Sequence, residues 1–230
     1  ITVNANITVQ SINMDLCTAS TAGCILDFSA NNNNVTLSLL FSSTGTGTRT
    51  LNMGNGTWLV QGSNNNTWNY TTVTNFTHNA NGSTLSFIPS SATPVGAITF
   101  IGGGRSFNVV THSGITNQVA FSISGAPTIA TLTLTAPFNT IFANGTTTTI
   151  TNAVSWLGTS TNQIFIGSSS QNQIATLALN AANGVAQWAA IRGLTVTTNA
   201  LTATNSFDLR SNTLITITPP TSGGGRIIGG

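Results

Sequence analysis

The segment Ala130–Ala136 reads ATLTLTA, with alanine or leucine at each even-numbered position and threonine between them. Such alternation is typical of a β-strand with one buried face. Threonine suits the other face because its branched side chain favours the extended backbone without adding charge. The same pattern recurs at Val35–Phe41, Leu85–Phe87, Ile98–Phe100, Ile164–Ile166, Ala175–Leu179, Leu194–Val196 and Ile215–Ile217. The sequence therefore predicts many short strands.

Turn signals separate these runs. They are Gly54-Asn55-Gly56, Ala80-Asn81-Gly82, Ala143-Asn144-Gly145 and Ala182-Asn183-Gly184. Asn and Gly accept the positive φ that tight turns require. The most helix-like stretch, the alanine-rich Ala175–Ile191, is interrupted by the fourth turn, and its apolar residues alternate. We expect strands there as well.

Many short strands without helices leave three fold classes: a sandwich, a barrel or a β-solenoid. Repetition at intervals of tens of residues favours an all-β solenoid, a stack of coils like a parallel β-helix. Coils of about 20–25 residues would let Asn and Thr side chains of successive coils bond to one another. A jelly-roll or stacked β-sandwich is the alternative.

Charge is scarce in this chain. Its 230 residues include three acids and five arginines, while Thr, Asn, Ser and Gly occupy 116 positions. Weak helix formers in such number exclude an all-α fold. Five scattered arginines do not form the basic cluster that nucleic-acid binding needs. No apolar run is long enough for a membrane-spanning helix, and we expect no membrane insertion.

The same composition bears on partners. Uncharged strand edges invite pairing with other chains, and a low net charge gives little protection against association. We therefore expect the chain to be a subunit of an assembly that contains further copies of itself.

Three regions are expected along the chain. Residues 1–47 form an N-terminal β segment, residues 48–218 form the β-repeat body, and residues 219–230 form a glycine-rich tail. In the tail, Arg226, Ile227 and Ile228 are a candidate anchor on a neighbouring subunit. An unstructured end is the equally weighted alternative.

Cys17 and Cys24 enclose six residues of a small, turn-prone loop. They form either a local disulfide or two buried thiols. Neither His78 nor His112 is close enough in sequence to complete a zinc-like motif, so we expect no metal site. A disulfide would indicate life outside a reducing cytosol.

The residues for catalysis are few. Glycoside hydrolysis needs two carboxylates beside one bond, and only Asp15, Asp27 and Asp208 are present. Neither histidine accompanies a G-x-S-x-G elbow. The stretch Gly102–Arg105 lacks the lysine and helix of a phosphate loop, so a turn is expected there. We expect no enzymatic activity and no cofactor.

Trp58, Trp68 and Tyr70 lie in a stretch rich in Asn and Thr. They are candidate contacts for a glycan, or aromatic residues that fill the core. Eight N-x-S/T sequons occur, at Asn6, Asn34, Asn55, Asn65, Asn69, Asn75, Asn81 and Asn144. The abundance of Asn, Ser and Thr alone accounts for about that number.

Three stretches carry a resemblance to a known group of proteins. They are TRTLNMGNGTWLVQGSNNNTWNY (Thr48–Tyr70), FIGGGRSFNVVTHSG (Phe100–Gly114) and NGTTTTITNAVSWLGTSTNQIFIGSSS (Asn144–Ser170). Together they resemble the Thr/Asn/Gly-rich β-repeat proteins of tailed bacteriophages, of the tail-fibre, tailspike or decoration type. The resemblance covers about Thr48 to Asn212 and implies a β-helical or β-sandwich virion component, often trimeric, that acts in adhesion or decoration. It implies no catalytic residue.

Three hypotheses follow. The first is a non-enzymatic phage structural protein, located in the virion, that contacts itself, other virion proteins and a host-surface glycan. The second is an extracellular filament or adhesin subunit of a prokaryote, in which Ile1–Gln10 completes a neighbour's sheet and sequons carry glycans. The third is a polysaccharide depolymerase.

Overall fold

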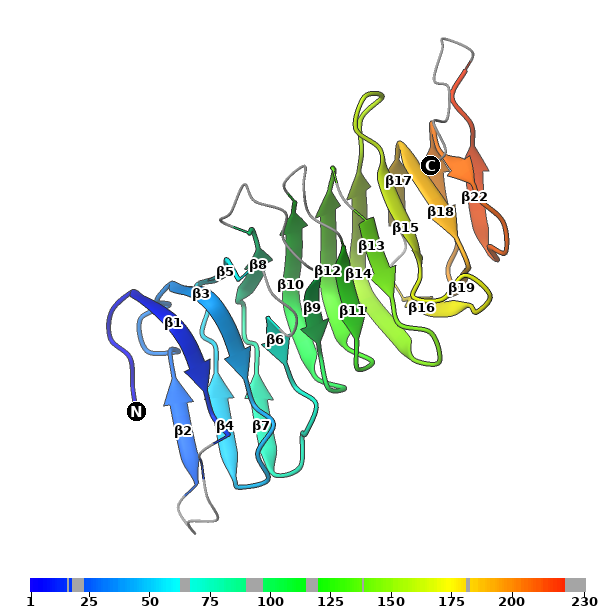
Figure 1. Cartoon of the computed structure of the whole chain (residues 1–230). Coiled ribbons are helices and arrows are strands. Elements are labelled where there is room, and N and C mark those ends of the chain that lie inside the picture. Colours follow the sequence, from blue (N-terminus) through cyan, green and yellow to red (C-terminus); the bar gives the residue numbers. More distant parts are fainter. Residues whose placement is uncertain are drawn as a thin grey trace.

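The computed structural model describes residues 1–15, 17, 23–62, 67–89, 97–114, 120–137, 139–180 and 183–221. Those residues form 22 β-strands and no helix. Figure 1 shows the strands stacked in chain order along a rod, with the N-terminus near one end and β22 near the other. Every pairing between the described strands is parallel, so each strand lies beside a strand of the preceding coil.

The strands form three columns that run along the rod. The first column contains, in order, β1 (Ile7–Asn13), β3 (Val35–Ser42), β5 (Thr57–Val60), β8 (Thr84–Phe87), β10 (Ser106–Ser113), β12 (Thr128–Thr135), β14 (Thr147–Leu157), β17 (Asn183–Gln187), β20 (Leu201–Thr204) and β22 (Ile215–Thr218). The second begins with the ends of β1 and β3 and continues through β6 (Trp68–Asn69), β9 (Ile98–Ile101), β11 (Phe121–Ser124), β13 (Asn139–Phe142), β15 (Ile164–Ser168), β18 (Ala189–Arg192) and β21 (Phe207–Asp208).

The third column is divided in two. Its first part is the separate three-stranded sheet of β2 (Cys24–Asp27), β4 (Arg49–Asn52) and β7 (Phe76–Asn79). Its second part contains the first residues of β10, β12 and β14, followed by β16 (Ala175–Leu179) and β19 (Leu194–Thr198). Among the described strands, β7 and β10 are the neighbours in this column that do not pair.

This topology is a β-solenoid, as the sequence predicts. A jelly-roll or stacked sandwich, the alternative, is wrong because those folds are built from antiparallel strands. The coils are less even in length than expected. Among the described strand pairings, the sequence separation between partners is shortest for Leu201 and Ile215 and much longer for Trp68 and Phe100.

The alternating pattern determines which side chains face the core. Val110, Leu132 and Val154 occupy equivalent positions in successive coils, and each is at most 2% exposed. Thr111 and Thr133, the next residues in two of these strands, are on the outer side and half-buried. Identical faces therefore stack into one continuous apolar core.

Asparagine side chains connect the coils at one corner. Asn6 Oδ1 accepts the Asn34 peptide N–H at 2.8 Å, and Asn34 Oδ1 accepts the Thr57 N–H at 2.8 Å. In the same way, Asn55 Oδ1 accepts the N–H of Gly82, in the following coil, at 2.9 Å. The amide satisfies peptide groups where the chain turns out of the sheet, without adding charge. The expected bonds between side chains of successive coils occur at single pairs, such as Asn79 with Asn52 and Asn31 with Asn4.

Most of the expected turns are present. The turns at Asn55, Asn81 and Asn144 are confirmed, whereas Asn183 and Gly184 begin strand β17 and so do not form the turn predicted for them. The expected N-terminal segment 1–47 contains β1, β2 and β3. Of these strands, β1 pairs with β3, while β2 and β3 pair with the following strands β4 and β5.

Candidate assembly surfaces

The three aromatic residues proposed as glycan contacts lie in the core. Trp58, Trp68 and Tyr70 are each 0% exposed. Trp68 stacks on Phe41 with ring centroids 4.5 Å apart, and Trp58 Nε1 donates to the Met53 carbonyl at 3.0 Å. Of the two interpretations of these residues, core filling is confirmed and glycan contact is wrong, because no ring face is open to a sugar. Burial also raises the pKa of Tyr70 well above its usual value.

Two arginines stabilise the corner beside this aromatic cluster. Arg49 is fully buried, and its Nη2 donates to the carbonyls of Thr72 (3.1 Å) and Thr74 (3.4 Å). Arg105, which follows the confirmed turn between β9 and β10, donates to the Val73 carbonyl at 2.8 Å. Burial lowers the pKa of Arg49, and Asp15 offsets part of that effect. We did not expect a buried arginine from the sequence.

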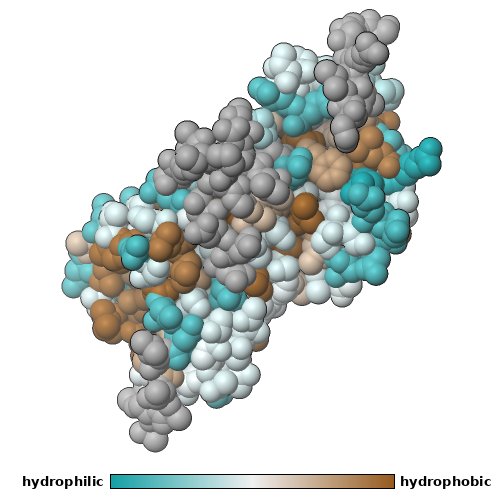
Figure 2. All heavy atoms as spheres, viewed as in Figure 1, coloured by the Kyte–Doolittle hydropathy of each residue, from teal (hydrophilic) through white to brown (hydrophobic). Residues whose placement is uncertain are grey.

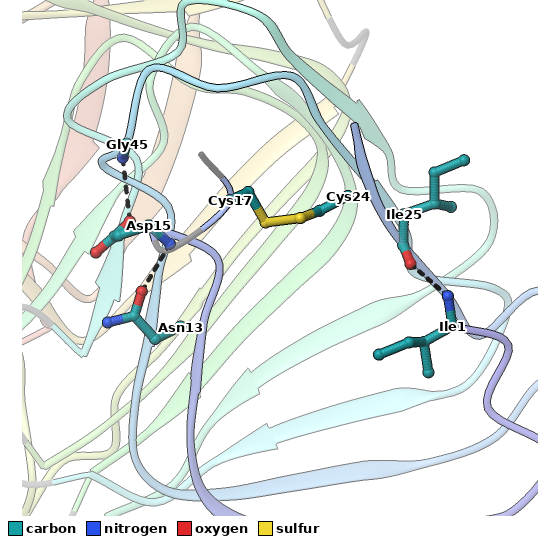
Figure 3. The surroundings of a disulfide bond; sticks show 7 residues. All are labelled: Ile1, Asn13, Asp15, Cys17, Cys24, Ile25 and Gly45. Atoms are coloured by element: carbon teal, nitrogen blue, oxygen red, sulfur yellow. Dashed lines mark hydrogen bonds between the residues drawn. A yellow bond between two sulfur atoms is a disulfide. The ribbon is translucent and has the colours of Figure 1, made fainter. Parts of the chain in front are cut away.

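The two cysteines form a disulfide (Figure 3). The bond joins Cys17 to the first residue of β2 and so attaches the chain after β1 to the next coil. Nearby, the Ile1 amino group donates to the Ile25 carbonyl at 2.7 Å. These contacts hold the first coil of the solenoid against the second.

All three aspartates accept hydrogen bonds, those of Asp15 from residues distant in the sequence and those of Asp27 and Asp208 from nearby ones. The carboxylate of Asp15 accepts the N–H groups of Thr44 and Gly45 as well as the Ser42 hydroxyl. Burial raises the pKa of Asp15, but these bonds outweigh it and the net shift is downward.

The other two carboxylates cap turns. Asp27 accepts the Ser29 hydroxyl at 2.6 Å and the Ser29 N–H at 2.8 Å, and these bonds lower its pKa. Asp208 accepts the N–H of Arg210 at 2.8 Å and the Asn212 amide at 2.7 Å. No group of three His, Cys, Asp or Glu side chains able to hold a metal ion occurs in the described part of the chain.

The last coil leaves its core side open. Ile215 and Ile217 stand in register with Leu201 and Ala203, which are fully buried, yet both isoleucines are only half-buried. Leu214 beside them is 51% exposed. A pocket of about 410 Å³ opens here, lined by Ser206, Phe207, Asp208, Leu209, Ile215, Ile217 and Pro219. β22 is the last described strand of the first column, where it pairs with β20.

The first coil is open in a similar way. Ile7 and Val9 in β1 stand in register with Val35 and Leu37, which are fully buried, but are themselves only half-buried. Ile1 is 86% exposed. Figure 2 shows brown, apolar surface at the β1 end of the molecule and again near β22. We name these surfaces the β1 end and the β22 end. Arg226, Ile227 and Ile228, the candidate anchor in the tail, lie outside the described residues.

Sequence signals for the two ends were weak. β1 and β22 carry the same alternating pattern as the other strands, so nothing in their composition marks their core faces as partly exposed. No described segment forms a helix long and apolar enough to cross a membrane.

The chain matches no family model, and neither the curated proteins nor the solved structures contain a significantly similar protein.

Proposed function

We propose that this chain is a non-enzymatic structural subunit of a bacteriophage virion, of the tail-fibre, spike or capsid-decoration kind. It contacts copies of itself, in a trimer, and other virion proteins, and it contributes to particle assembly and host-surface adhesion. The phage setting rests on the resemblance of Thr48–Tyr70, Phe100–Gly114 and Asn144–Ser170 to virion β-repeat proteins.

The observation that carries the assembly role is the open core at the β1 and β22 ends. Apolar side chains that are fully buried in interior coils are half-exposed there, beside strand edges that have hydrogen-bonding capacity left. Solenoid proteins need terminal coils with polar outer faces to stay separate in solution. The partly exposed apolar side chains of β1 and β22 are best understood as surfaces that further protein covers.

A lateral surface on the first column supports contact between copies. Val185 (44% exposed) and Leu157 (38% exposed) lie on the adjacent strands β17 and β14. Exposed apolar side chains on a face otherwise covered with Thr and Ser mark a site where another chain would exclude water.

A pair of substitutions on β22 tests the assembly role. Ile217→Glu places a charge on the core side of the β22 end, and Thr216→Glu places the same charge on the outer side of the same strand. Light scattering of the parent chain is expected to give an oligomer. Ile217→Glu is expected to lower the mass, and Thr216→Glu to leave it unchanged. A parent chain that is monomeric, or two variants that behave alike, would contradict the assembly role of this end.

The second candidate function is an extracellular filament or adhesin subunit. It is favoured by the position of β1 and β22 at opposite ends of one parallel column. If β22 of one copy paired with β1 of the next, the ladder would continue from copy to copy and produce an open-ended filament. Mass spectrometry of the native protein separates the two functions, because glycans on the sequons would favour the extracellular filament.

A further inference from the structure

Strands β7 and β10 face each other in the third column without pairing. Elsewhere in this column, each described strand pairs with the strand of the preceding coil. The turn at Ala80–Ser83 separates β7 from β8, which does pair with β10. Between β7 and β10 lies a groove of about 350 Å³, lined by residues 78–81 and 106–108. We name it the seam groove.

Peptide groups on both sides of the seam groove are directed toward it. In a parallel ladder, alternate residues turn their N–H and C=O groups to the same neighbour. The carbonyls of Asn75 and Asn79 accept N–H groups from Arg49 and Met53 on the β4 side. His78, of the opposite parity, therefore presents its peptide groups to the seam groove.

The same argument applies to the other side. The Arg105 carbonyl accepts the Thr128 N–H, so Arg105 and Phe107 face β12. Ser106 and Asn108 then turn their peptide groups toward β7. The seam groove thus has two strand edges facing each other, and both present peptide groups to it. The Ser106 backbone also takes part in a hydrogen bond with the His78 ring.

Polar side chains add further hydrogen-bonding groups to the seam groove. The Asn79 amide nitrogen donates to Asn52 Oδ1 at 2.6 Å, and that of Asn108 donates to the Ser83 carbonyl at 3.3 Å. Their carbonyl oxygens therefore remain as acceptors. Asn81, exposed in the turn, and Ser106 contribute an amide and a hydroxyl. The Phe107 ring is buried in the core beneath the groove and offers no open face to a ligand.

The lining is uncharged at neutral pH. Burial lowers the pKa of His78 to about 3, and the charge of Arg105 acts in the same direction against an opposing hydrogen bond with the Ser106 backbone. The Arg105 guanidinium is itself engaged with the Val73 carbonyl. Neither a carboxylate nor a free cation lines the seam groove in the described residues. An ionic ligand would therefore find no counter-charge there.

We propose that the seam groove binds a neutral saccharide. Sugar hydroxyls donate and accept hydrogen bonds at once, which matches an uncharged lining of peptide groups, amides and a hydroxyl. The volume lies at the lower end of ligand sites, about 300–1,000 Å³, so one or two sugar rings are the expected size. Binding of this saccharide does not depend on how copies of the chain assemble.

A glycan array tests the proposal. The labelled chain is applied to neutral oligomers of glucose, galactose, mannose and N-acetylglucosamine, and to uronic-acid and sulfated oligomers. We expect binding to at least one neutral series, and titration calorimetry then gives its affinity. Asn81→Gly removes an amide from the seam groove, and glycine readily keeps the positive φ of Asn81. Asn108→Ala removes a second amide.

Each variant is expected to weaken binding about tenfold. Asn172→Ala, at an exposed turn outside the seam groove, is the matched control and should bind like the parent. The urea midpoint and oligomer mass of each variant separate loss of a contact from misfolding or altered assembly. The proposal is overturned if no neutral oligomer binds, if only charged oligomers bind, or if both groove variants bind like the control.

Discussion

His78 is expected to make the solenoid less stable as the pH falls from 7 to 5. Its ring contacts Phe107, with centroids 4.7 Å apart, and Tyr70, and its Nε2 lies 3.1 Å from Met53 Sδ. The folded pKa is about 3, against 6.5 for an unperturbed histidine. Between these values the unfolded chain binds a proton that the folded chain does not. Stability is therefore complete above pH 6.5 and declines as the pH falls.

Linkage gives the size of this effect. Proton binding to the unfolded chain alone lowers the free energy of unfolding by about 2 kcal/mol between pH 7 and pH 5. Urea titrations at the two pH values measure that difference. In His78→Phe, which keeps an aromatic ring, the difference should shrink by about 2 kcal/mol. His112→Phe replaces the second histidine and is the matched control. This variant should keep the part of the pH dependence of stability that His78 supplies. A His78→Phe chain with the full pH dependence would refute the assignment of this effect to His78.

Three further predictions concern the core and the first coil. Replacing both Cys17 and Cys24 with Ser should lower the free energy of unfolding by about 2–3 kcal/mol, because the unfolded chain regains the entropy that closing this short loop removes. Urea denaturation under oxidising conditions measures the difference. An unchanged urea midpoint would mean that the disulfide does not hold the first coil. Trp58→Ala should cost about 3–5 kcal/mol in the same assay, since it leaves a cavity in the aromatic cluster, and it should not alter saccharide binding. Loss of binding with intact stability would instead favour a glycan contact at Trp58. Gly56→Ala should cost about 1–3 kcal/mol, because its Cβ would collide with the Asn33 carbonyl oxygen. An unaltered midpoint would show that this corner can relax.

The sequence contained most of what determines the fold. Period-two runs such as Ala130–Ala136 identify strands because residues of one parity face the core. The same rule could have placed Trp58, for which two interpretations stayed open, and Arg49, which was overlooked. Trp58 shares parity with Val60, and Arg49 shares parity with Leu51, and all four are buried. The surrounding composition left both a surface and a core position open for the tryptophan, whereas strand parity assigns it to the core.

The seam groove and the open ends could not be predicted in this way. Whether β7 pairs with β10 depends on how the turn at Ala80–Ser83 offsets two coils, and that offset is a property of three-dimensional stacking. The exposure of Ile7 and Ile217 depends on what packs against β1 and β22. Both strands have the local pattern of interior strands, so local sequence carries no signal for either feature.

The mass and shape of the native chain test the assembly role most directly. Light scattering gives the number of copies, and negative-stain electron microscopy shows how they are arranged. The proposed virion subunit predicts a discrete trimeric rod. Open-ended filaments would favour the extracellular filament, with Ile1–Gln10 the first segment to delete. A monomer at every accessible concentration would contradict the claim that the β1 and β22 ends are covered by partners.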